Sequence, residues 1–259
     1  IAYNTAKACF KEMTVPEAVS ITSAFQETML AAKPAGEMES CSVLQTDDAF
    51  WKVFEFDFVS GKPYDNADFD AGAAKAVISE DMARRLFGTS EVVGKTFLLN
   101  HTAYLISGVV RSVSRLARYA YAQVWIPLSS TDAFTTAWGD EKIMGIVAVF
   151  ILAKSKEDFP AIHNEADRLK AVFMAGHPNF DLLYRGQPDT YFVAAQRYSA
   201  NNPPAVKEAV RQYILTLLVL LIVPAVNLSG LTLSRMRKRL SEIGVRKAFG
   251  APRRELMIQ

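Results

Sequence analysis

A long uncharged run near the end of the chain limits what this sequence can fold into. Residues Tyr213 to Leu233 contain no Asp, Glu, Lys, Arg or His. At about 1.5 Å of rise per residue, roughly twenty helical residues cross the ~30 Å hydrocarbon core of a bilayer. A buried helix of a soluble protein is rarely apolar on every side for six turns. The run therefore predicts one transmembrane helix, which we place at residues 210–234.

Small and polar residues in the second half of this run predict contact with another helix. Pro224 would kink the span, and Asn227, Ser229 and Gly230 follow it closely. Membrane helices tolerate an internal proline, and small residues allow two helix backbones to approach each other. We therefore expect Pro224, Asn227, Ser229 and Gly230 to pack against a partner helix within the bilayer.

Basic residues directly after the run set the orientation of the helix. Arg235, Arg237, Lys238 and Arg239 follow it, and Lys and Arg near a membrane end mark the cytoplasmic side. Residues 235–259 hold eight Lys/Arg and two Asp/Glu, so this tail carries +6 and the body −4. The body has no nucleic-acid-binding module and no basic stripe with interleaved aromatics. Residues 1 to about 210 should therefore lie outside the cytoplasm, with no nucleic acid as partner.

The tail itself is open to two interpretations from its residues alone. Glu242 to Phe249 predicts a short charged helix, Gly250 a helix stop, and Pro252 a fresh helix start. Such a compact basic segment could contact either a protein partner or anionic lipid head groups.

A resemblance favours the protein partner. Glu242–Ala251 matches the pattern E-I-G-[IV]-R-[KR]-A-x-G-A at every fixed position. This stretch resembles the cytoplasmic segment after the second membrane helix in MacB/FtsX-like ABC transporter permeases. The resemblance implies that residues 235–259 are a coupling segment that docks on a cytoplasmic ABC ATPase. The residues it assigns to coupling are Glu242, Ile243, Gly244, Arg246, Lys247, Gly250 and Arg253.

Two further stretches resemble the outer domains of the same permeases. Residues 76–95 are similar to the family signature V-I-S-E-x-x-A-R-x-L-F-G followed by V-G-K, and residues 48–63 to an aromatic D-x-F-x-V-F-x-F passage. In the first, Ser79 predicts a helix N-cap and Gly88 the helix end. In the second, Phe54, Phe56 and Phe58 alternate with acidic residues, which is the period of a strand with one buried face.

The remaining patterns predict an α+β outer domain. We expect helices at 16–30 and 156–174, and strands at 41–45, 97–99, 104–110, 124–128, 143–154, 180–184 and 190–194. Strand–helix–strand units on either side of a β-rich middle suggest two halves that flank an insertion. The resemblance implies the same division: porter-like halves at 1–62 and 141–205, and a β-rich inserted subdomain at 63–140.

No pattern supports catalysis, a metal or a cofactor. His101, His163 and His177 lack the spacing of paired ligands, and Asp65–Asp70 lacks the glycine and glutamate of a calcium loop. Gly94-Lys95-Thr96 lacks the upstream glycine and the helix of a P-loop, so we reject nucleotide binding there. Arg111–Tyr121 is basic and aromatic, either a solvated loop or a site for an anionic ligand. Cys9 and Cys41 are either isolated thiols or a disulfide in an oxidising compartment.

These observations predict part of an ABC permease in the bacterial cytoplasmic membrane, itself not an enzyme. By the resemblance, ATP hydrolysis by a partner drives motion of the outer domain, which acts on a periplasmic substrate for export or extraction. The expected partners are the cytoplasmic ATPase, a second permease copy or paralogue, a periplasmic adaptor or substrate, and the bilayer. The alternative is a membrane-anchored regulator whose outer domain senses a ligand or activates a cell-wall hydrolase. Because the residues from Ile1 onward show no signal-peptide pattern and Gln259 interrupts a helix pattern, we expect a fragment of a longer protein.

Overall fold

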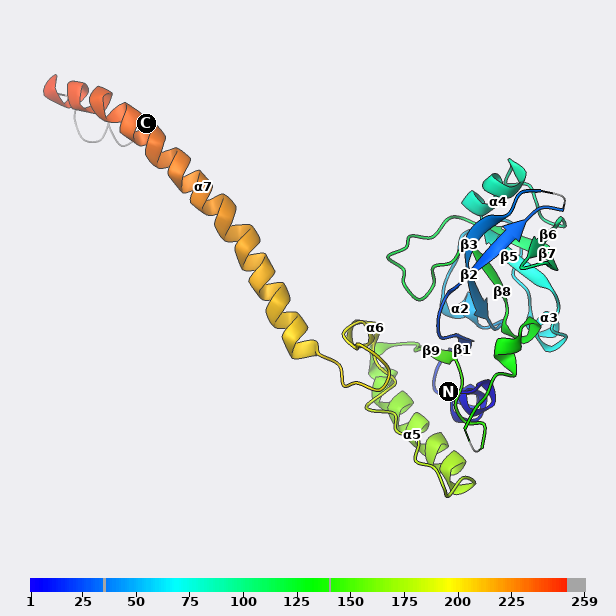
Figure 1. The fold of residues 1–259 in the computed structure, drawn as a ribbon. Coiled ribbons are helices and arrows are strands. Elements are labelled where there is room, and N and C mark those ends of the chain that lie inside the picture. Colours follow the sequence, from blue (N-terminus) through cyan, green and yellow to red (C-terminus); the bar gives the residue numbers. More distant parts are fainter. Residues whose placement is uncertain (35, 140, 251–259) are drawn as a thin grey trace. The chain divides into compact units, whose positions relative to one another are not determined.

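A computed structural model of the chain describes residues 1–34, 36–139 and 141–250 (Figure 1). The chain divides into two compact units, Ile1–Leu183 and Tyr184–Gln259. The first unit is a mixed α and β structure built on one sheet. The second consists of a short looped segment and one long helix.

The sheet of the first unit contains nine strands and closes on itself. The strands are β1 (Ala18–Ser23), β2 (Glu27–Ala32), β3 (Glu39–Thr46), β4 (Phe58–Gly61), β5 (Lys75–Ser79), β6 (Thr96–Leu99), β7 (Thr102–Val110), β8 (Val124–Pro127) and β9 (Val147–Leu152). They follow the order β2-β6-β7-β5-β8-β3-β1-β9, and β4 pairs with β7. Because β2 also pairs with β3, six of the strands form a closed ring. Only β3–β8 and β5–β7 are parallel pairs.

Short helices and one longer helix surround this sheet. In the first unit they are α1 (Tyr3–Ala6) with a π-helical continuation (Lys7–Lys11), α2 (Phe50–Val53), α3 (Asn66–Asp70), α4 (Glu80–Phe87) and α5 (Phe159–Ala175). Single 3-10 turns lie at Leu128–Ser130, Asp132–Phe134 and Lys156–Asp158. The second unit holds α6 (Tyr191–Ala194) and α7 (Val206–Ala248).

The two faces of the ring carry separate apolar clusters. Residues two apart on the same strand face the same side of a sheet. One face joins α4 in a buried cluster that includes Cys41 and Val43, Ala76 and Ile78, and Val124 and Ile126. The opposite face, with Leu44, Val77 and Trp125, is covered by aromatic rings from residues 50–64. A sheet that is buried on both faces gives continuous apolar runs rather than a clean alternation.

Several local predictions are confirmed. The Ser79 side chain accepts a hydrogen bond from the Met82 amide at the start of α4, and Gly88 ends that helix at φ 74°. Asn100 and His101 form the turn between β6 and β7, both at positive φ. The helix predicted at 156–174 is α5, and Ile162, Ala166 and Leu169 are buried on its apolar face.

Four sequence predictions are wrong. The helix expected at 16–30 is instead strands β1 and β2. Val19-Ser20-Ile21-Thr22 alternates apolar and polar residues and is β-branched at three positions, which favours a strand, but the apolar residues also fit a helical stripe across 16–30. Residues 180–184 form no regular element, and the strand expected at 190–194 is the helical turn α6, which Thr190 caps. Phe54 and Phe56 pack in the aromatic cluster but lie before β4 rather than in it.

The predicted halves and insertion share one sheet. From the segment 63–140, β6 pairs with β2 and β8 pairs with β3, while β9 pairs with β1. The first unit also continues to Leu183. As a division into porter-like halves and an inserted subdomain, the boundaries at 62/63 and 140/141 stay a prediction. Cys9 and Cys41 are both buried and are not joined by a disulfide.

Candidate functional site

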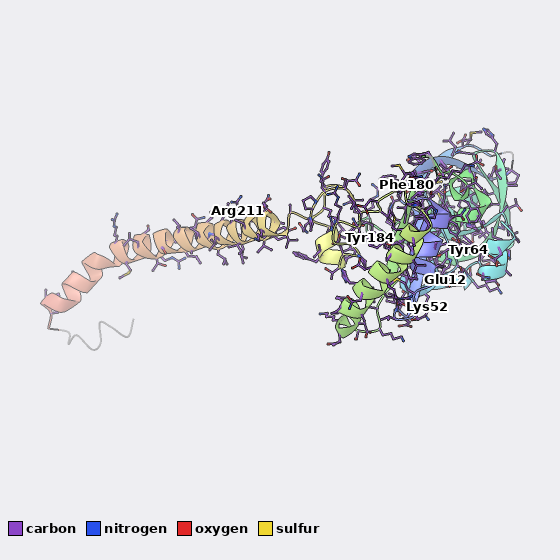
Figure 2. The ribbon with its side chains drawn as sticks, turned by 90° about the horizontal axis from the view of Figure 1, so that it is seen from below. Glu12, Lys52, Tyr64, Phe180, Tyr184 and Arg211 are labelled. Atoms are coloured by element: carbon purple, nitrogen blue, oxygen red, sulfur yellow. The ribbon has the colours of Figure 1, made fainter. Side chains whose placement is uncertain are left out.

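The candidate site lies in the second unit, along α7 and at its N-terminal end. α7 contains 43 residues, about 65 Å at 1.5 Å per residue. Within its segment Val206–Arg237, an 18-residue stretch reaches a mean hydropathy of 2.4 and is not buried against other described parts of the chain. Leu220 and Leu221, for example, are 64% and 60% exposed. Side chains project outward along α7 (Figure 2), and its apolar side chains between Ile214 and Leu233 are exposed. A helix of this length and composition is suited to a bilayer rather than to water.

The predicted packing residues of the span lie on two faces of α7. Residues three, four and seven apart share one side of a helix, so Asn227 and Gly230 lie on the same stripe as Ser234. Ser229 lies elsewhere, and its hydroxyl donates to the Ala225 carbonyl at 2.8 Å. Pro224 is inside the helix. No atom of the described chain lies within 4 Å of a Cβ placed on Gly230, so this side can accept a second helix.

The predicted coupling segment continues the same helix. The short separate helix expected at Glu242–Phe249 is instead the C-terminal end of α7, which runs without interruption to Ala248. Glu242, Ile243, Gly244, Arg246 and Lys247 therefore belong to the helix that contains the apolar run. Gly250 follows at φ 89°, a left-handed conformation that ends the helix as predicted. Arg253 lies outside the described residues.

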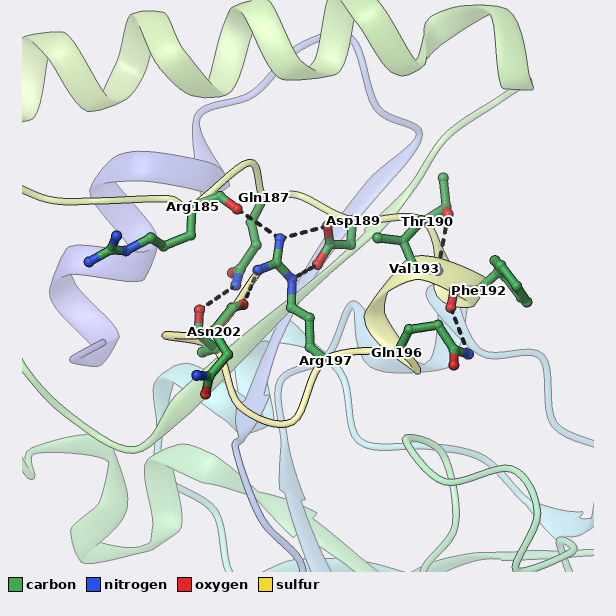
Figure 3. Close-up of polar contacts among 10 residues, drawn as sticks. Arg185, Gln187, Asp189, Thr190, Phe192, Val193, Gln196, Arg197 and Asn202 are labelled. Carbon is green, nitrogen blue, oxygen red and sulfur yellow. Dashed lines mark hydrogen bonds and ion pairs between the residues drawn. The ribbon is translucent and has the colours of Figure 1, made fainter. Parts of the chain in front are cut away.

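A buried ion pair organises the looped segment that precedes α7 (Figure 3). Arg197 forms a two-pronged contact with the carboxylate of Asp189 through Nε and Nη2. Its guanidinium also donates to the backbone carbonyls of Arg185 and Asn202. The side chains of Arg197 and Asp189 are only 6% and 8% exposed. Bidentate charge-assisted contacts of this kind fix geometry better than single hydrogen bonds.

A second set of contacts connects this segment to the start of α7. The Gln196 carbonyl accepts from the Ala205 amide at 3.0 Å, directly before the helix. The Gln196 side chain accepts from the hydroxyl of Tyr213 at 3.4 Å, on the third turn of α7. Gln187 also donates to the Ala200 carbonyl at 3.0 Å. We call residues 185–205 with these contacts the juxtamembrane joint.

Sequence reasoning missed this joint. Asp189 and Arg197 lie eight residues apart in an irregular segment, and such a pair has no periodic signal. The apolar residues at 191–194 led instead to the wrong strand prediction. The only local indication was the turn-forming run Asn201-Asn202-Pro203-Pro204, which predicts an irregular connection before the helix.

Two buried carboxylates in the first unit have structural partners. Asp47 accepts from Lys11 Nζ at 2.6 Å, Ser20 Oγ at 2.7 Å and the Ile21 amide at 2.9 Å. Burial raises the pKa of Asp47, while Lys11 and the hydrogen bonds oppose that rise. Glu165 on α5 accepts from the Thr14 and Val15 amides at 3.0 Å. Desolvation raises the pKa of Glu165, but these hydrogen bonds outweigh it and hold the pKa below its ordinary value.

The histidines do not gather into a site. His163 and His177 each contact a backbone carbonyl of α5 through Nδ1, and His101 lies in the β6–β7 turn. Within the ranges that the structure describes, no group of three or more His, Cys, Asp or Glu side chains could hold a metal ion.

Comparison with known proteins identifies the family to which the first unit belongs. Residues 2–169 match the model of the MacB-like periplasmic core domain. The chain is 23% identical over 240 residues to the uncharacterized ABC transporter permease YknZ of Bacillus subtilis (strain 168), covering 92% of this chain and 56% of YknZ. It is 22% identical over 222 residues to the macrolide export ATP-binding/permease protein MacB of Pasteurella multocida (strain Pm70), covering 85% of this chain and 31% of MacB. The chain thus spans about half or less of these relatives.

Solved structures show the same fold. The extracellular domain of YknZ from Gram-positive bacteria superposes with a TM-score of 0.52 at 17% identity, over 69% of this chain and 84% of that domain. The periplasmic region of MacB from Actinobacillus actinomycetemcomitans gives a TM-score of 0.50 at 15% identity, over 69% and 75%. A periplasmic domain of this kind followed by one apolar helix fits a membrane protein with an extracytoplasmic domain.

Proposed function

The chain belongs to the family of the MacB-like periplasmic core domain, and on this premise we propose that it transmits ATP-driven motion across the membrane to the first unit (Ile1–Leu183), which we call the outer unit. In this proposal a separate cytoplasmic ABC ATPase binds the segment 235–259. The movement passes along α7 to the juxtamembrane joint and then to the first unit. The outer unit acts on an extracytoplasmic substrate for export or extraction.

The continuity of α7 is the observation that carries the proposal. One helix includes both the apolar span and the residues Glu242 to Lys247 that resemble the coupling motif. Helical hydrogen bonding makes such a rod stiff along its axis, except at Pro224, which removes one of these hydrogen bonds. A displacement at its cytoplasmic end therefore reaches Val206 rather than being absorbed by a flexible linker.

The joint supports the second half of the path. The Arg197–Asp189 pair closes the segment 185–202 on itself, and Gln196 connects it to Ala205 and Tyr213. A guanidinium that is shared between a carboxylate and two backbone carbonyls resists local rearrangement. Movement of the first turns of α7 should therefore move this segment as well.

Partners follow from the same geometry. The open stripe with Asn227, Gly230 and Ser234 supports a second permease copy or paralogue as a packing partner in the bilayer. The similarity to a macrolide export protein supports an exported substrate as partner of the outer unit, and a periplasmic adaptor is proposed from the resemblance alone. Ser229, on another face, belongs to this proposed packing set only if a further helix contacts that side.

Variants at the cytoplasmic end test the proposal. Glu242→Lys reverses a charge that is one helical turn from Arg246, and Gly250→Val strains a residue at φ 89°. We expect this double variant to lose most of the ATPase stimulation by the permease, while the outer unit stays folded. The measurement is ATPase binding and turnover in nanodiscs with the cognate ATPase, at fixed salt.

The matched control separates protein coupling from lipid contact. Arg235→Gln with Arg237→Gln removes two charges at the membrane end of the same helix, and we expect it to leave stimulation nearly unchanged. Normal turnover in the Glu242/Gly250 variant, together with a loss in the Arg235/Arg237 variant, would replace the coupling role with a lipid-contacting one.

A further inference from the structure

A second feature of interest lies in the first unit, in a groove beside the loop that joins β7 to β8. This loop, residues 111–123, extends away from the sheet (Figure 1). Together with α4 and strands β2 and β3 it borders a groove of about 470 Å³. Ligand sites for small molecules commonly have volumes of roughly 300–1,000 Å³.

Three arginines border this groove. Arg85 comes from α4, and Arg115 and Arg118 come from the loop. Glu39 lies 3.7 Å from Arg85 and offsets one of the three charges. In the described part of the chain, no carboxylate forms an ion pair with Arg115 or Arg118. The groove therefore has an excess of about two positive charges that the protein does not neutralise.

Contacts within the loop and to the strands position these guanidinium groups. Arg115 donates from Nε to the hydroxyl of Tyr121 at 3.3 Å and lies over that ring, 5.9 Å from its centroid. Gln26 donates to the carbonyl of Arg118 at 3.1 Å, which holds the loop beside β2. The Nη groups of Arg115 are not used by these contacts, and they form a planar fork suited to a carboxylate or phosphate.

The rest of the lining is polar and uncharged. Ser42 and Gln123 are held together by a hydrogen bond from the Ser42 amide to Gln123 Oε1 at 3.0 Å. Cys41 also borders the groove, and burial raises the pKa of its thiol to about 11, so it adds no negative charge near neutral pH. Hydroxyl and amide groups beside uncompensated arginines are the composition expected for recognition of an anion.

We infer that this groove binds a small anionic molecule whose carboxylate or phosphate groups contact Arg115 and Arg118. The binding site lies wholly within the first unit and does not depend on the proposed transmission through α7. Arg85 and the Ser42–Gln123 pair would contact the remainder of the molecule. Binding would weaken with salt, because it depends on charges near the surface.

Calorimetric titration of the full chain in a neutral maltoside detergent tests this site. The probes are citrate, which carries carboxylates, and pyrophosphate, which carries phosphates, each at low ionic strength. We expect saturable binding of at least one of them. The double variant Arg115→Gln/Arg118→Gln should weaken that binding by at least about tenfold, on the basis of two lost charge-assisted contacts.

The control variant removes the same charge elsewhere. Arg84 pairs with Glu80 outside the groove, and Arg111 is exposed at the start of the loop, so Arg84→Gln/Arg111→Gln should bind within about twofold of the unmodified chain. Binding of citrate alone or pyrophosphate alone would support the site and identify its preferred group. Equal weakening in both double variants, or no saturable heat with either probe, would overturn the inference. If the Arg115/Arg118 variant loses the tryptophan fluorescence of the folded chain, the single variant Arg115→Gln replaces it in the same titration, and it should also weaken binding of the probe.

Discussion

Glu165 illustrates how single residues hold the outer unit together. Its carboxylate accepts hydrogen bonds from the backbone amides of Thr14 and Val15 and from the hydroxyl of Thr14, so it fixes the N-terminal segment against α5. Those donors stabilise the ionised form, and they lose hydrogen-bond acceptors if the carboxylate is removed or protonated. The N-terminal helical segment and β1 then lose an anchor that no local sequence pattern predicts, because the partners are about 150 residues apart.

Glu165→Gln should therefore destabilise the protein, by about 1–3 kcal/mol at pH 7. Because the folded-state pKa lies below the ordinary 4.5, the contribution of Glu165 is present above that value and is lost as pH falls through the lower folded pKa. The measurement is unfolding followed by tryptophan fluorescence between pH 7 and pH 3.

The control is Asp167→Asn, an exposed residue on the same helix, which should change stability little. The difference between the unmodified chain and Glu165→Gln should shrink toward acid pH. A difference that stays constant across this range would show that packing, not charge, is what Glu165 provides.

At the scale of elements, local signals predicted structure well where they act within a few residues. Ser79, Gly88 and the Asn100-His101 turn each have a local chemical cause, and α4 and the β6–β7 hairpin follow from them. β1 and β2 were missed in part because β1 pairs with β9 and β2 pairs with β6, and both partners lie far away in the sequence. The joint at Arg197 was missed for a different reason, because a pair eight residues apart in an irregular segment has no periodic signal. The predicted span at 210–234 is helical, because a long uncharged run can be recognised without knowing its contacts. The helix α7 extends beyond the predicted span at both ends.

A charge at the centre of the span tests its membrane position. Leu220→Arg places a charge near the middle of the apolar segment, at a cost of roughly 2.5–3.5 kcal/mol on insertion scales. Leu233→Arg places the same charge beside Arg235, where its long side chain can reach the head groups. Leu220 and Leu233 are similarly exposed, at 64% and 53%.

We expect the membrane-integrated fraction to fall for Leu220→Arg and to stay near normal for Leu233→Arg, as measured by alkaline extraction of membranes. If α7 were instead a helix buried against other protein, depth would not matter and the two variants should behave alike.

At the scale of the whole molecule, the family match and the apolar helix agree with the orientation predicted from the basic tail. In the proposed path, movement of the outer unit depends on what reaches it through residues 184–248. The buried Arg197–Asp189 ion pair lies on that route within the second unit. Arg197→Gln should interrupt the route above the membrane and leave the cytoplasmic contact intact. Arg185 provides a matched control, because only its backbone carbonyl takes part in the joint.

The most direct test measures ATP-driven movement between the outer unit and the joint. Spin labels at Leu116→Cys and Tyr198→Cys occupy positions that are 89% and 96% exposed, whereas the native thiols are buried. Distances are measured by pulsed electron resonance in nanodiscs that contain the cognate ATPase, with and without ATP and vanadate. Our account predicts a changed distance distribution in the labelled chain and in its Arg185→Gln variant. It predicts no change in Arg197→Gln, although ATP hydrolysis continues. A distribution that ATP leaves unaltered in the labelled chain with an intact joint would contradict transmission through α7.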